Sequence, residues 1–398
     1  MRRLRKPTIA ALTGLAAAAL VSGCGGGSLG GGDSDDGGGG GDTATPVRLG
    51  LVVPTSGVYA PLGEDMKQGF ELYLAQHGQK LGGHAVELEV VDEGATPATG
   101  VAATQRLLQG DVNAVVGIVN SATALGVRDA FDEAKIPLIV ANAGADAITG
   151  AKKSDFVWRT SFSNGQVAAA LGPQAAQTCT KGAFLVAADY AAGKEATAGF
   201  RQTFTAAGGK VVGSVFPPFG TTTNYQPFLA QIRQSGADCA YSFFAGAEAV
   251  AFTKQYAQFG LKDTVKLYSS GFLTEGGVLK GAGAAAAGIE TSLHYSDQLD
   301  TPANKAFVGE YQAKFGESPT VYAVQTYDAA HVLDDAFKTG IDGPAVVKGL
   351  QGISSVDSPR GTWRFDDGHG PQQTYYLRRV DQGAGGLVNT VVQPLSGA

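Results

Sequence analysis

The residue with the most specific chemistry in this chain is Cys24. It follows the small residues Ser22 and Gly23, after a basic start (residues 1–6) and an apolar stretch without a charge (residues 9–21). This order is typical of a secretory signal, and a cysteine directly after the cleavage point marks a bacterial lipoprotein signal, whose thiol takes a diacylglyceryl group. Residues 1–23 are therefore predicted to be a lipoprotein signal peptide and Cys24 the site of lipid attachment. A plain membrane anchor and a soluble export signal are the alternatives.

Cys179 and Cys239 are the other two cysteines, and each precedes an apolar run, residues 182–188 and 240–245. If these runs are neighbouring parallel strands, their starts lie side by side. Because an exported protein works in an oxidising compartment, we expect a disulfide between the two thiols. The closed loop, about 60 residues long, would stabilise the fold by roughly 4 kcal/mol in the chain-entropy model. Two buried free thiols are the alternative.

No arrangement of residues typical of catalysis or metal binding stands out. None of the five histidines, at positions 77, 84, 294, 331 and 369, has a second His or Cys at metal-ligand spacing. There is no H-E-x-x-H helix and no G-x-x-x-x-G-K-[ST] phosphate loop. The Gly-rich run 281–288 lacks the strand-then-helix context of a dinucleotide site. The sequence predicts no catalytic residue, no metal site and no cofactor.

Three loops of small and polar residues follow strand-like runs: residues 54–60, 120–123 and 142–146. Ligands of parallel α/β sheets bind outside the carboxyl ends of the strands, so these loops are the candidate binding surface. Ser121 can cap the next helix by accepting a backbone N–H. The same helix start can instead seat an anion, because free N–H groups and the positive end of the helix dipole face it. We expect a ligand carboxylate there.

The elements that must position these loops alternate between short apolar runs and longer amphipathic stretches. Continuous apolar runs are typical of parallel strands buried on both faces, so the pattern predicts α/β layers. The series restarts after residue 160, which indicates two lobes. The predicted strands are residues 47–53, 85–91, 113–119, 137–141, 183–188, 210–216, 239–244, 264–269 and 288–295. The predicted helices are residues 61–77, 97–109, 121–134, 164–178, 191–207, 225–235, 248–259, 303–315 and 322–338, and a hairpin is expected between 362–365 and 374–380.

Composition agrees with an exported globular protein. Hydrophobic residues make up 44% of the chain and charged residues 17%, as in globular rather than disordered proteins. Residues 24–45 are Gly-rich and are predicted to form a flexible tether. The formal net charge is −6, and no Lys/Arg run lies outside the signal, so no nucleic-acid partner is expected.

Several stretches of the chain resemble the leucine/isoleucine/valine-binding proteins of ABC importers. The resemblance is carried by VRLGLVVPTSGVYAPLGEDMKQGFELYL, NAVVGIVNSATALGVRDAFDEAKIPLIVANAGADAIT, FVWRTSFSN, YAVQTYDAAHVL and RFDDGHG, and it covers nearly all of residues 47–382. It implies an α/β fold of two Rossmann-like lobes with parallel sheets, joined by a three-strand hinge (periplasmic-binding-protein-like I). The implied division is 46–160 for lobe 1, to which 298–360 returns, 161–297 for lobe 2, and 361–398 for a C-terminal hairpin and tail near the hinge.

The resemblance also implies a ligand site between the lobes. Ser121 matches the loop serine that holds the ligand carboxylate in the amino-acid binders. Ala143 and Ala145 stand where the family supplies a carbonyl and a threonine hydroxyl, so that hydroxyl is missing here. The acidic residue that usually pairs with the ligand ammonium has no clear counterpart, since Glu275 lies far along its loop. The predicted ligand-binding residues are Tyr59, Leu62, Asn120, Ser121, Ala122, Ala143, Gly144, Ala145, Tyr190, Phe244, Ala245, Gly246 and Phe272.

The function implied is that of an extracytoplasmic substrate-binding lipoprotein, tethered to the outer face of the cytoplasmic membrane. It would be a monomer that delivers a small carboxylate to an ABC permease. A branched-chain or other apolar amino acid is the first expectation. NAGADAIT, DYAAGKE and SFFAGAEAV also resemble a branch of the family that takes aromatic or other non-amino carboxylates, with Phe243 a further wall residue, and this is the close alternative. A ligand sensor for a receptor is a third reading.

Overall fold

The computed structural model describes residues 45–150 and 153–395. The predicted signal peptide, Cys24 and all of the predicted tether except residue 45 lie outside this part of the chain.

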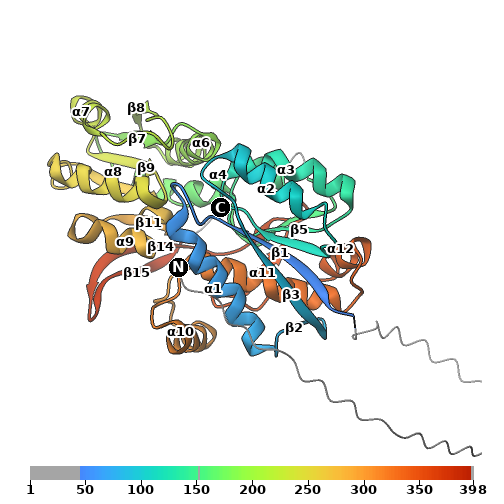
Figure 1. The fold of residues 1–398 in the computed structure, drawn as a ribbon. Helices are drawn as coiled ribbons and strands as arrows, with labels where there is room; N and C mark the ends of the chain where they lie inside the picture. Colours follow the sequence, from blue (N-terminus) through green and yellow to red (C-terminus); the bar gives the residue numbers. More distant parts are fainter. Residues whose placement is uncertain (1–44, 151–152, 396–398) are drawn as a thin grey trace, which may run out of the picture. The chain divides into compact units, whose positions relative to one another are not determined.

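Six strands form the first sheet, in the order β2-β3-β1-β4-β5-β6. Figure 1 labels β1, β2, β3 and β5 of this sheet. All neighbours pair in parallel except β2 with β3. Both faces of β1 are buried, because alternate residues such as Leu51 and Val52 enter two different core clusters. The strands are β1 (Val47–Val53), β2 (Lys80–Leu81), β3 (His84–Asp92), β4 (Ala114–Gly117), β5 (Leu138–Val140) and β6 (Val157–Arg159).

Helices cover this sheet on both faces. Helices α1 (Ala60–Gln76) and α11 (Val321–Phe337) lie against each other although they are far apart in sequence (Figure 1). Met66 and Phe70 of α1 share a core cluster with Leu49 of β1. The helices α2 (Pro97–Leu107), α3 (Ser121–Ala134), α10 (Pro302–Phe315) and α12 (Gly343–Gln351), with the 3-10 turn η1 (Asp146–Ile148), complete this lobe.

Seven strands form the second sheet, in the order β15-β14-β11-β10-β9-β7-β8. Its central strands are parallel, and β14 and β15 extend it as an antiparallel pair. The strands are β7 (Ala183–Ala187), β8 (Val211–Val215), β9 (Cys239–Phe243), β10 (Lys266–Ser270), β11 (Glu290–Leu293), β14 (Tyr375–Gly383) and β15 (Gly386–Leu395). The helices are α4 (Asn164–Ala169), α5 (Gly172–Ala176), α6 (Ala191–Ala206), α7 (Gln226–Gln234), α8 (Gly246–Gln258) and α9 (Gly277–Ala282), with η2 (Gly271–Thr274) and η3 (Gly283–Ala286).

The predicted C-terminal hairpin differs in its pairing. The short strands β12 (Arg364–Phe365) and β13 (Pro371–Gln372) pair with each other and not with residues 374–380. The strand β14 instead pairs with β11 and with β15. The opposed residues Gly383 and Gly386 leave a two-residue turn between β14 and β15, and such short turns favour glycine. The prediction of a two-lobed α/β fold with parallel sheets is nonetheless confirmed.

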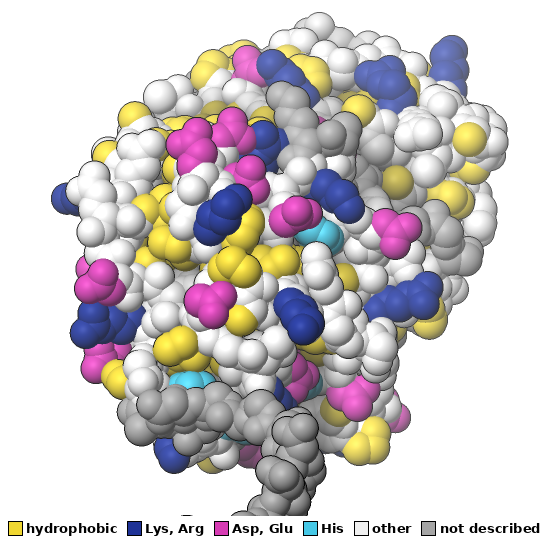
Figure 2. All heavy atoms as spheres, turned by 90° about the vertical axis from the view of Figure 1, so that its right-hand side faces the viewer, with side chains coloured by type: hydrophobic (Ala, Val, Ile, Leu, Met, Phe, Trp, Pro, Cys, Tyr) yellow, Lys and Arg dark blue, Asp and Glu magenta, His cyan; other side chains and the backbone are white. Residues whose placement is uncertain are grey.

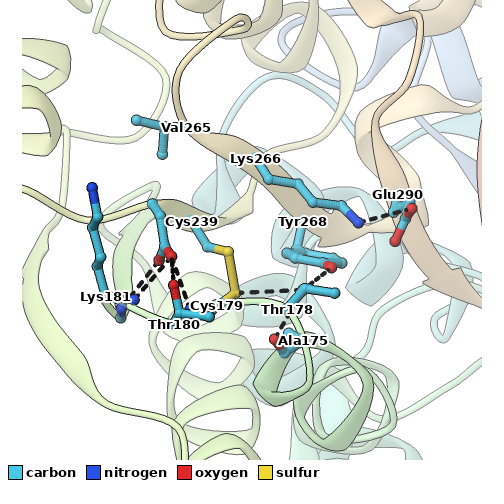
Figure 3. Close-up of a disulfide and its surroundings, with 12 residues drawn as sticks. Ala175, Thr178, Cys179, Thr180, Lys181, Cys239, Val265, Lys266, Tyr268 and Glu290 are labelled. Carbon is cyan, nitrogen blue, oxygen red and sulfur yellow. Dashed lines mark hydrogen bonds and ion pairs between the residues drawn. A yellow bond between two sulfur atoms is a disulfide. The ribbon is translucent and has the colours of Figure 1, made fainter.

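A disulfide joins Cys179, after α5, to Cys239 at the start of β9 (Figure 3). The two Cα atoms lie 5.6 Å apart, and 60 residues separate them in sequence. Beside it the hydroxyl groups of Thr178 and Tyr268 lie 2.6 Å apart. The starts of the two strands lie side by side, as expected, because β7 and β9 are parallel neighbours with Ala183 opposite Cys239.

The surface carries both signs of charge. Figure 2 shows Lys and Arg side chains interspersed with Asp and Glu on the face that it displays. None of the helices within residues 45–150 and 153–395 has the length and apolarity that a membrane crossing requires.

Candidate functional site

A small cavity lies where the predicted loops of both lobes meet. It encloses about 20 Å³, which is room for about one water molecule. Any ligand larger than a water molecule therefore needs the lobes to separate, both to enter the cavity and to make room for it. The lining residues are Tyr59, Leu62, Val119, Ser121, Asn142, Gly144, Phe162, Asn164, Tyr190, Ala192, Phe243, Ala245, Phe272 and Tyr322.

A larger groove, of about 700 Å³, lies elsewhere between α1, α9 and β15. It is lined by four carboxylates, Asp65, Glu275, Asp297 and Glu317, against the single basic residue Lys280. Such a groove is unsuited to an anionic ligand. The smaller cavity at the strand ends is therefore the candidate ligand site.

Ser121 begins helix α3 and lines the cavity. The N-cap is Asn120 and not Ser121, which corrects the capping option considered from the sequence. The Asn120 side chain accepts hydrogen bonds from the backbone N–H groups of Ala122 and Thr123, which is what a cap residue does. The Ser121 hydroxyl is therefore not used as a cap. Asn120 and Ala122, which were predicted to bind the ligand, do not line the cavity.

The loop before Ser121 is held by a buried carboxylate. Glu93 is 1% exposed, and it accepts the backbone N–H of Val119 at 2.8 Å and that of Asn120 at 2.9 Å. Burial raises the pKa of Glu93 to about 6, against the lowering effect of these hydrogen bonds. Next to them Ile118 has a φ of 66°, a strained conformation for a β-branched residue. Ser121 is the first residue of α3, so its backbone N–H has no partner inside the helix and can donate to an anion.

The loop of residues 142–146 contributes only part of what was predicted. Gly144 lines the cavity, whereas Ala143 and Ala145 are buried in the core of the first lobe. The carbonyl of Ala145 accepts a hydrogen bond from Arg159 Nη1 at 2.9 Å. Asn142, which was not among the predicted residues, also lines the cavity and donates to Gln325 Oε1 at 2.7 Å.

The second lobe supplies aromatic walls. Tyr190, Ala245 and Phe272 line the cavity as placed by the sequence, but Phe244 does not. Phe244 packs against Tyr225 and Phe252 in the core behind β9, because successive residues of a strand point to opposite faces. Its neighbour Phe243 faces the cavity instead.

Contacts between the lobes border the cavity. Tyr59 OH from the first lobe donates to Tyr190 OH of the second at 2.9 Å, and Leu62 lies beside them on the lining. The backbone N–H of Ala247 donates to the Val58 carbonyl at 3.1 Å. Gly246 does not line the cavity, but a Cβ there would lie 2.1 Å from the Val58 carbonyl oxygen. It therefore permits this close approach of the lobes.

Residues that follow no predicted strand were missed by sequence reasoning. Phe162 and Asn164 lie where the chain crosses from β6 to α4, and Tyr322 lies in the first turn of α11. A Ser-x-x-Gln pattern at Ser163 signals the start of α4, and Ser163 does accept the N–H of Gln166. That signal places a helix start without indicating that it faces a ligand. Val119 and Ala192, next to predicted positions, complete the lining.

The chemistry of the cavity is aromatic and neutral. Six of its lining side chains are aromatic, and no Asp, Glu, Lys or Arg is among them. Glu275 is not available to a ligand ammonium group, since its carboxylate is paired with Arg378 Nη1 at 2.8 Å and accepts the backbone N–H of Val321. The site can thus bind an apolar, aromatic body and seat an anion on neutral donors, but it offers no side-chain counter-charge to a cation.

Comparison with known proteins identifies the family. The chain belongs to the periplasmic binding protein family, whose model matches residues 46–385. It is 32% identical over 344 residues to Leu/Ile/Val-binding protein homolog 6 of Brucella melitensis biotype 1, covering 84% of this chain and 87% of that protein. The resemblance to the leucine/isoleucine/valine-binding proteins is therefore confirmed.

Solved structures of similar proteins carry aromatic acids. A solute-binding protein of an ABC transporter from R. palustris, in complex with benzoate, has a TM-score of 0.82 and 38% identity, covering 89% of this chain and 98% of that one. One from Rhodopseudomonas palustris BisB5, in complex with 3,4-dihydroxybenzoic acid, has a TM-score of 0.82 and 30% identity, covering 88% and 97%.

Proposed function

We propose that this protein is the extracytoplasmic solute-binding subunit of an ABC importer and captures an aromatic, non-amino carboxylate. In this proposal the ligand carboxylate binds at Ser121 and its ring lies among the aromatic side chains of both lobes. The protein makes or breaks no covalent bond, and the loaded, closed form delivers the ligand to a membrane permease.

The observation that carries the proposal is the lining of the cavity. A buried ammonium group without a counter-charge costs several kcal/mol, and no carboxylate lines this cavity. A carboxylate, by contrast, can accept hydrogen bonds from the O–H and the backbone N–H of Ser121 at the positive end of the α3 dipole. Tyr190, Phe243 and Phe272 supply the apolar surface that small-ligand sites usually have. The similarity to a benzoate-bound solute-binding protein supports the same ligand class.

A branched-chain or other apolar amino acid is the second candidate. It is favoured by the names of the curated relatives, which are called Leu/Ile/Val-binding protein homologs. In this case neutral acceptors such as Asn164 Oδ1 would have to satisfy the ammonium group without help from an acidic side chain in the lining. The lining disfavours this arrangement.

Thermal unfolding of the purified protein with benzoate, leucine and phenylalanine tests the proposal. A ligand at 100 times its Kd stabilises the folded state by about 2.7 kcal/mol, which raises the melting temperature measurably. We expect a shift with benzoate and none with either amino acid. A shift with leucine or phenylalanine alone would contradict the proposal.

We also propose that the protein is exported, anchored by lipid on Cys24 to the outer face of the cytoplasmic membrane, and monomeric. The support for this is the order of basic, apolar and small residues before Cys24. In cells grown with a radioactive fatty acid, the wild-type protein should become labelled at Cys24. A Cys24→Ala variant should not be labelled.

A further inference from the structure

The first residue of α4, Asn164, presents an unpaired acceptor at the cavity. Its side chain lines the cavity, and the residue is 1% exposed. Within residues 45–150 and 153–395 no donor reaches Asn164 Oδ1. A buried amide oxygen without a partner is costly, so a ligand that supplies the missing donor would gain from it.

The orientation of this amide is fixed by a carboxylate. Asn164 Nδ2 donates to Glu195 Oε2 of α6 at 2.8 Å. If the amide turned over, Oδ1 would face the acceptor-only carboxylate, and two acceptors repel each other. The backbone N–H of Asn164 also donates to the Gly144 carbonyl at 2.7 Å. Both contacts hold Oδ1 in place as an acceptor.

The acceptor lies close to the proposed carboxylate seat. Asn164 Nδ2 is 3.5 Å from Ser121 Oγ, and Oδ1 is bonded to the same carbon as Nδ2. On the other side Oδ1 lies against Gly144, where a Cβ would be only 2.3 Å from it. A ligand carboxylate oxygen placed at Oδ1 would be repelled, and a ring C–H would leave Oδ1 unpaired. A hydroxyl group satisfies it by donating a hydrogen bond. An ammonium group would also donate, but the lining offers it no counter-charge.

We infer that Asn164 is a specificity-determining residue whose Oδ1 accepts a hydrogen bond from a ring hydroxyl, so that the preferred ligands are hydroxylated aromatic carboxylates. This inference rests on the proposed function, because it assumes an aromatic carboxylate in the cavity. The inference adds that the ligand has a hydrogen-bond donor on its ring, and it names Asn164 as the residue that recognises this donor.

The test is isothermal titration calorimetry with benzoate and its 2-, 3- and 4-hydroxy derivatives on wild type, Asn164→Leu and Glu195→Gln. In wild type at least one hydroxy derivative should bind about ten-fold or more tightly than benzoate, since a site built to pair a hydroxyl discriminates against the analogue that lacks it. The ratio to follow is the Kd of benzoate divided by the Kd of that hydroxy derivative. Asn164→Leu removes the acceptor and should bring this ratio close to one while benzoate still binds. Glu195→Gln lets the amide turn over and should lower the same ratio.

The control is Gln166→Leu, which makes the same change from amide to aliphatic side chain at an exposed position of α4. It should leave the ratio as in wild type. If Asn164→Leu does not fold, Glu195→Gln carries the test alone. Equal binding of benzoate and all hydroxy derivatives by wild type would overturn this inference and leave the proposed function intact, as would a ratio that survives in both variants. Failure of every aromatic acid to bind would overturn the proposed function and this inference with it.

Discussion

At the scale of single residues, Ser121 is the side chain on which the proposed anion binding should depend most directly. Asn120 performs the capping, so the Ser121 hydroxyl and N–H are both left for the ligand. We expect Ser121→Ala to weaken carboxylate binding by about 1–3 kcal/mol, because the ligand would lose a hydrogen bond to a charged group. Calorimetry measures the change. Ser214→Ala, an exposed serine on β8, is the matched control, and an unchanged affinity in Ser121→Ala would remove this residue from the site.

A second residue, Asp65 on α1, makes stability depend on pH. Burial raises the pKa of Asp65 to about 7 from 3.8, although Thr320 Oγ1 donates to it at 2.9 Å. The folded state therefore binds a proton that the unfolded state has lost between about pH 4 and pH 7, and the free energy of unfolding falls as the pH rises through this window.

Asp65→Asn should remove this dependence. The variant and the wild type should unfold with similar free energies near pH 4, and the variant should be more stable by at least about 1 kcal/mol near pH 8. Urea unfolding at several pH values measures the difference. Glu93 and Glu248, whose pKa values burial also raises, are present in both proteins and cancel. A constant difference from acid to alkaline pH would contradict the expectation.

At the scale of elements, the disulfide ties the end of α5 to the start of β9. A 60-residue separation corresponds to about 4 kcal/mol in the chain-entropy model. The double variant Cys179→Ser/Cys239→Ser should therefore unfold about 2–4 kcal/mol more easily. The comparison is urea unfolding with and without reductant, and the variant should not respond to reductant. A wild type that is equally insensitive to reductant would show that the bond contributes little.

The buried pair of Arg378 on β14 and Glu275 after η2 joins elements from both lobes. Arg378 also donates to the carbonyls of Tyr295 and Gly271, and Glu275 accepts the N–H of Val321 at the start of α11. Four chain segments thus meet at one ion pair, where the chain returns to the first lobe and where Phe272 is presented to the cavity.

Breaking this pair should be strongly destabilising. Arg378→Met leaves the Glu275 carboxylate buried without its partner, which typically costs about 3–5 kcal/mol. Glu275→Gln combined with Arg378→Met should recover part of that loss, because no unpaired charge remains. Chemical unfolding of the single and double variants gives the coupling energy. Additive effects of the two substitutions would contradict the pairing.

Most elements were predictable from sequence because buried parallel strands and amphipathic helices leave regular patterns. The strands 47–53 and 239–244 were placed within one or two residues. It is harder to predict which of two successive residues at the end of a strand faces the cavity. Phe243 and Phe244 are both apolar, and only one of them can do so. The predicted pairing of the C-terminal hairpin was wrong for a related reason. The segment around Gly383 and Gly386 forms a tight turn, and an apolar run does not show by its sequence which strand it pairs with.

At the scale of the whole molecule, the described part of the chain is closed around its cavity. Three contacts hold the lobes together there: Tyr59 with Tyr190, Val58 with Ala247, and Asp146 with Glu195. A ligand that touches both lobes favours a closed state, in which the lobes meet around it and leave more room than the about 20 Å³ found here. The residues that complete the site from a distance, such as Tyr322, could not be found from sequence, because only the folded chain brings α11 to the loops of the first 160 residues.

Gly246 offers a direct test of closure. A Cβ at this position would lie 2.1 Å from the Val58 carbonyl oxygen, so Gly246→Ala should hinder closure without disturbing either core. We expect the ligand Kd to rise by about ten-fold or more, which corresponds to about 1.4 kcal/mol. Gly220→Ala is the control, because Gly220 also has a positive φ but open space around it. Equal effects of the two substitutions would mean that backbone strain, and not closure, is responsible.

The neutral lining of the cavity has a consequence for the setting in which such a protein would work. Ions in solution screen attraction between exposed charges over about 8–10 Å, so a receptor that draws in its ligand with lysine or arginine loses affinity as salinity rises. No lysine or arginine lines this cavity, and the anion seat proposed at Ser121 would consist of a hydroxyl, an N–H and a helix end between the lobes. Capture of an organic acid should then vary little between fresh water and brine, which suits a cell that cannot regulate the salt outside its membrane.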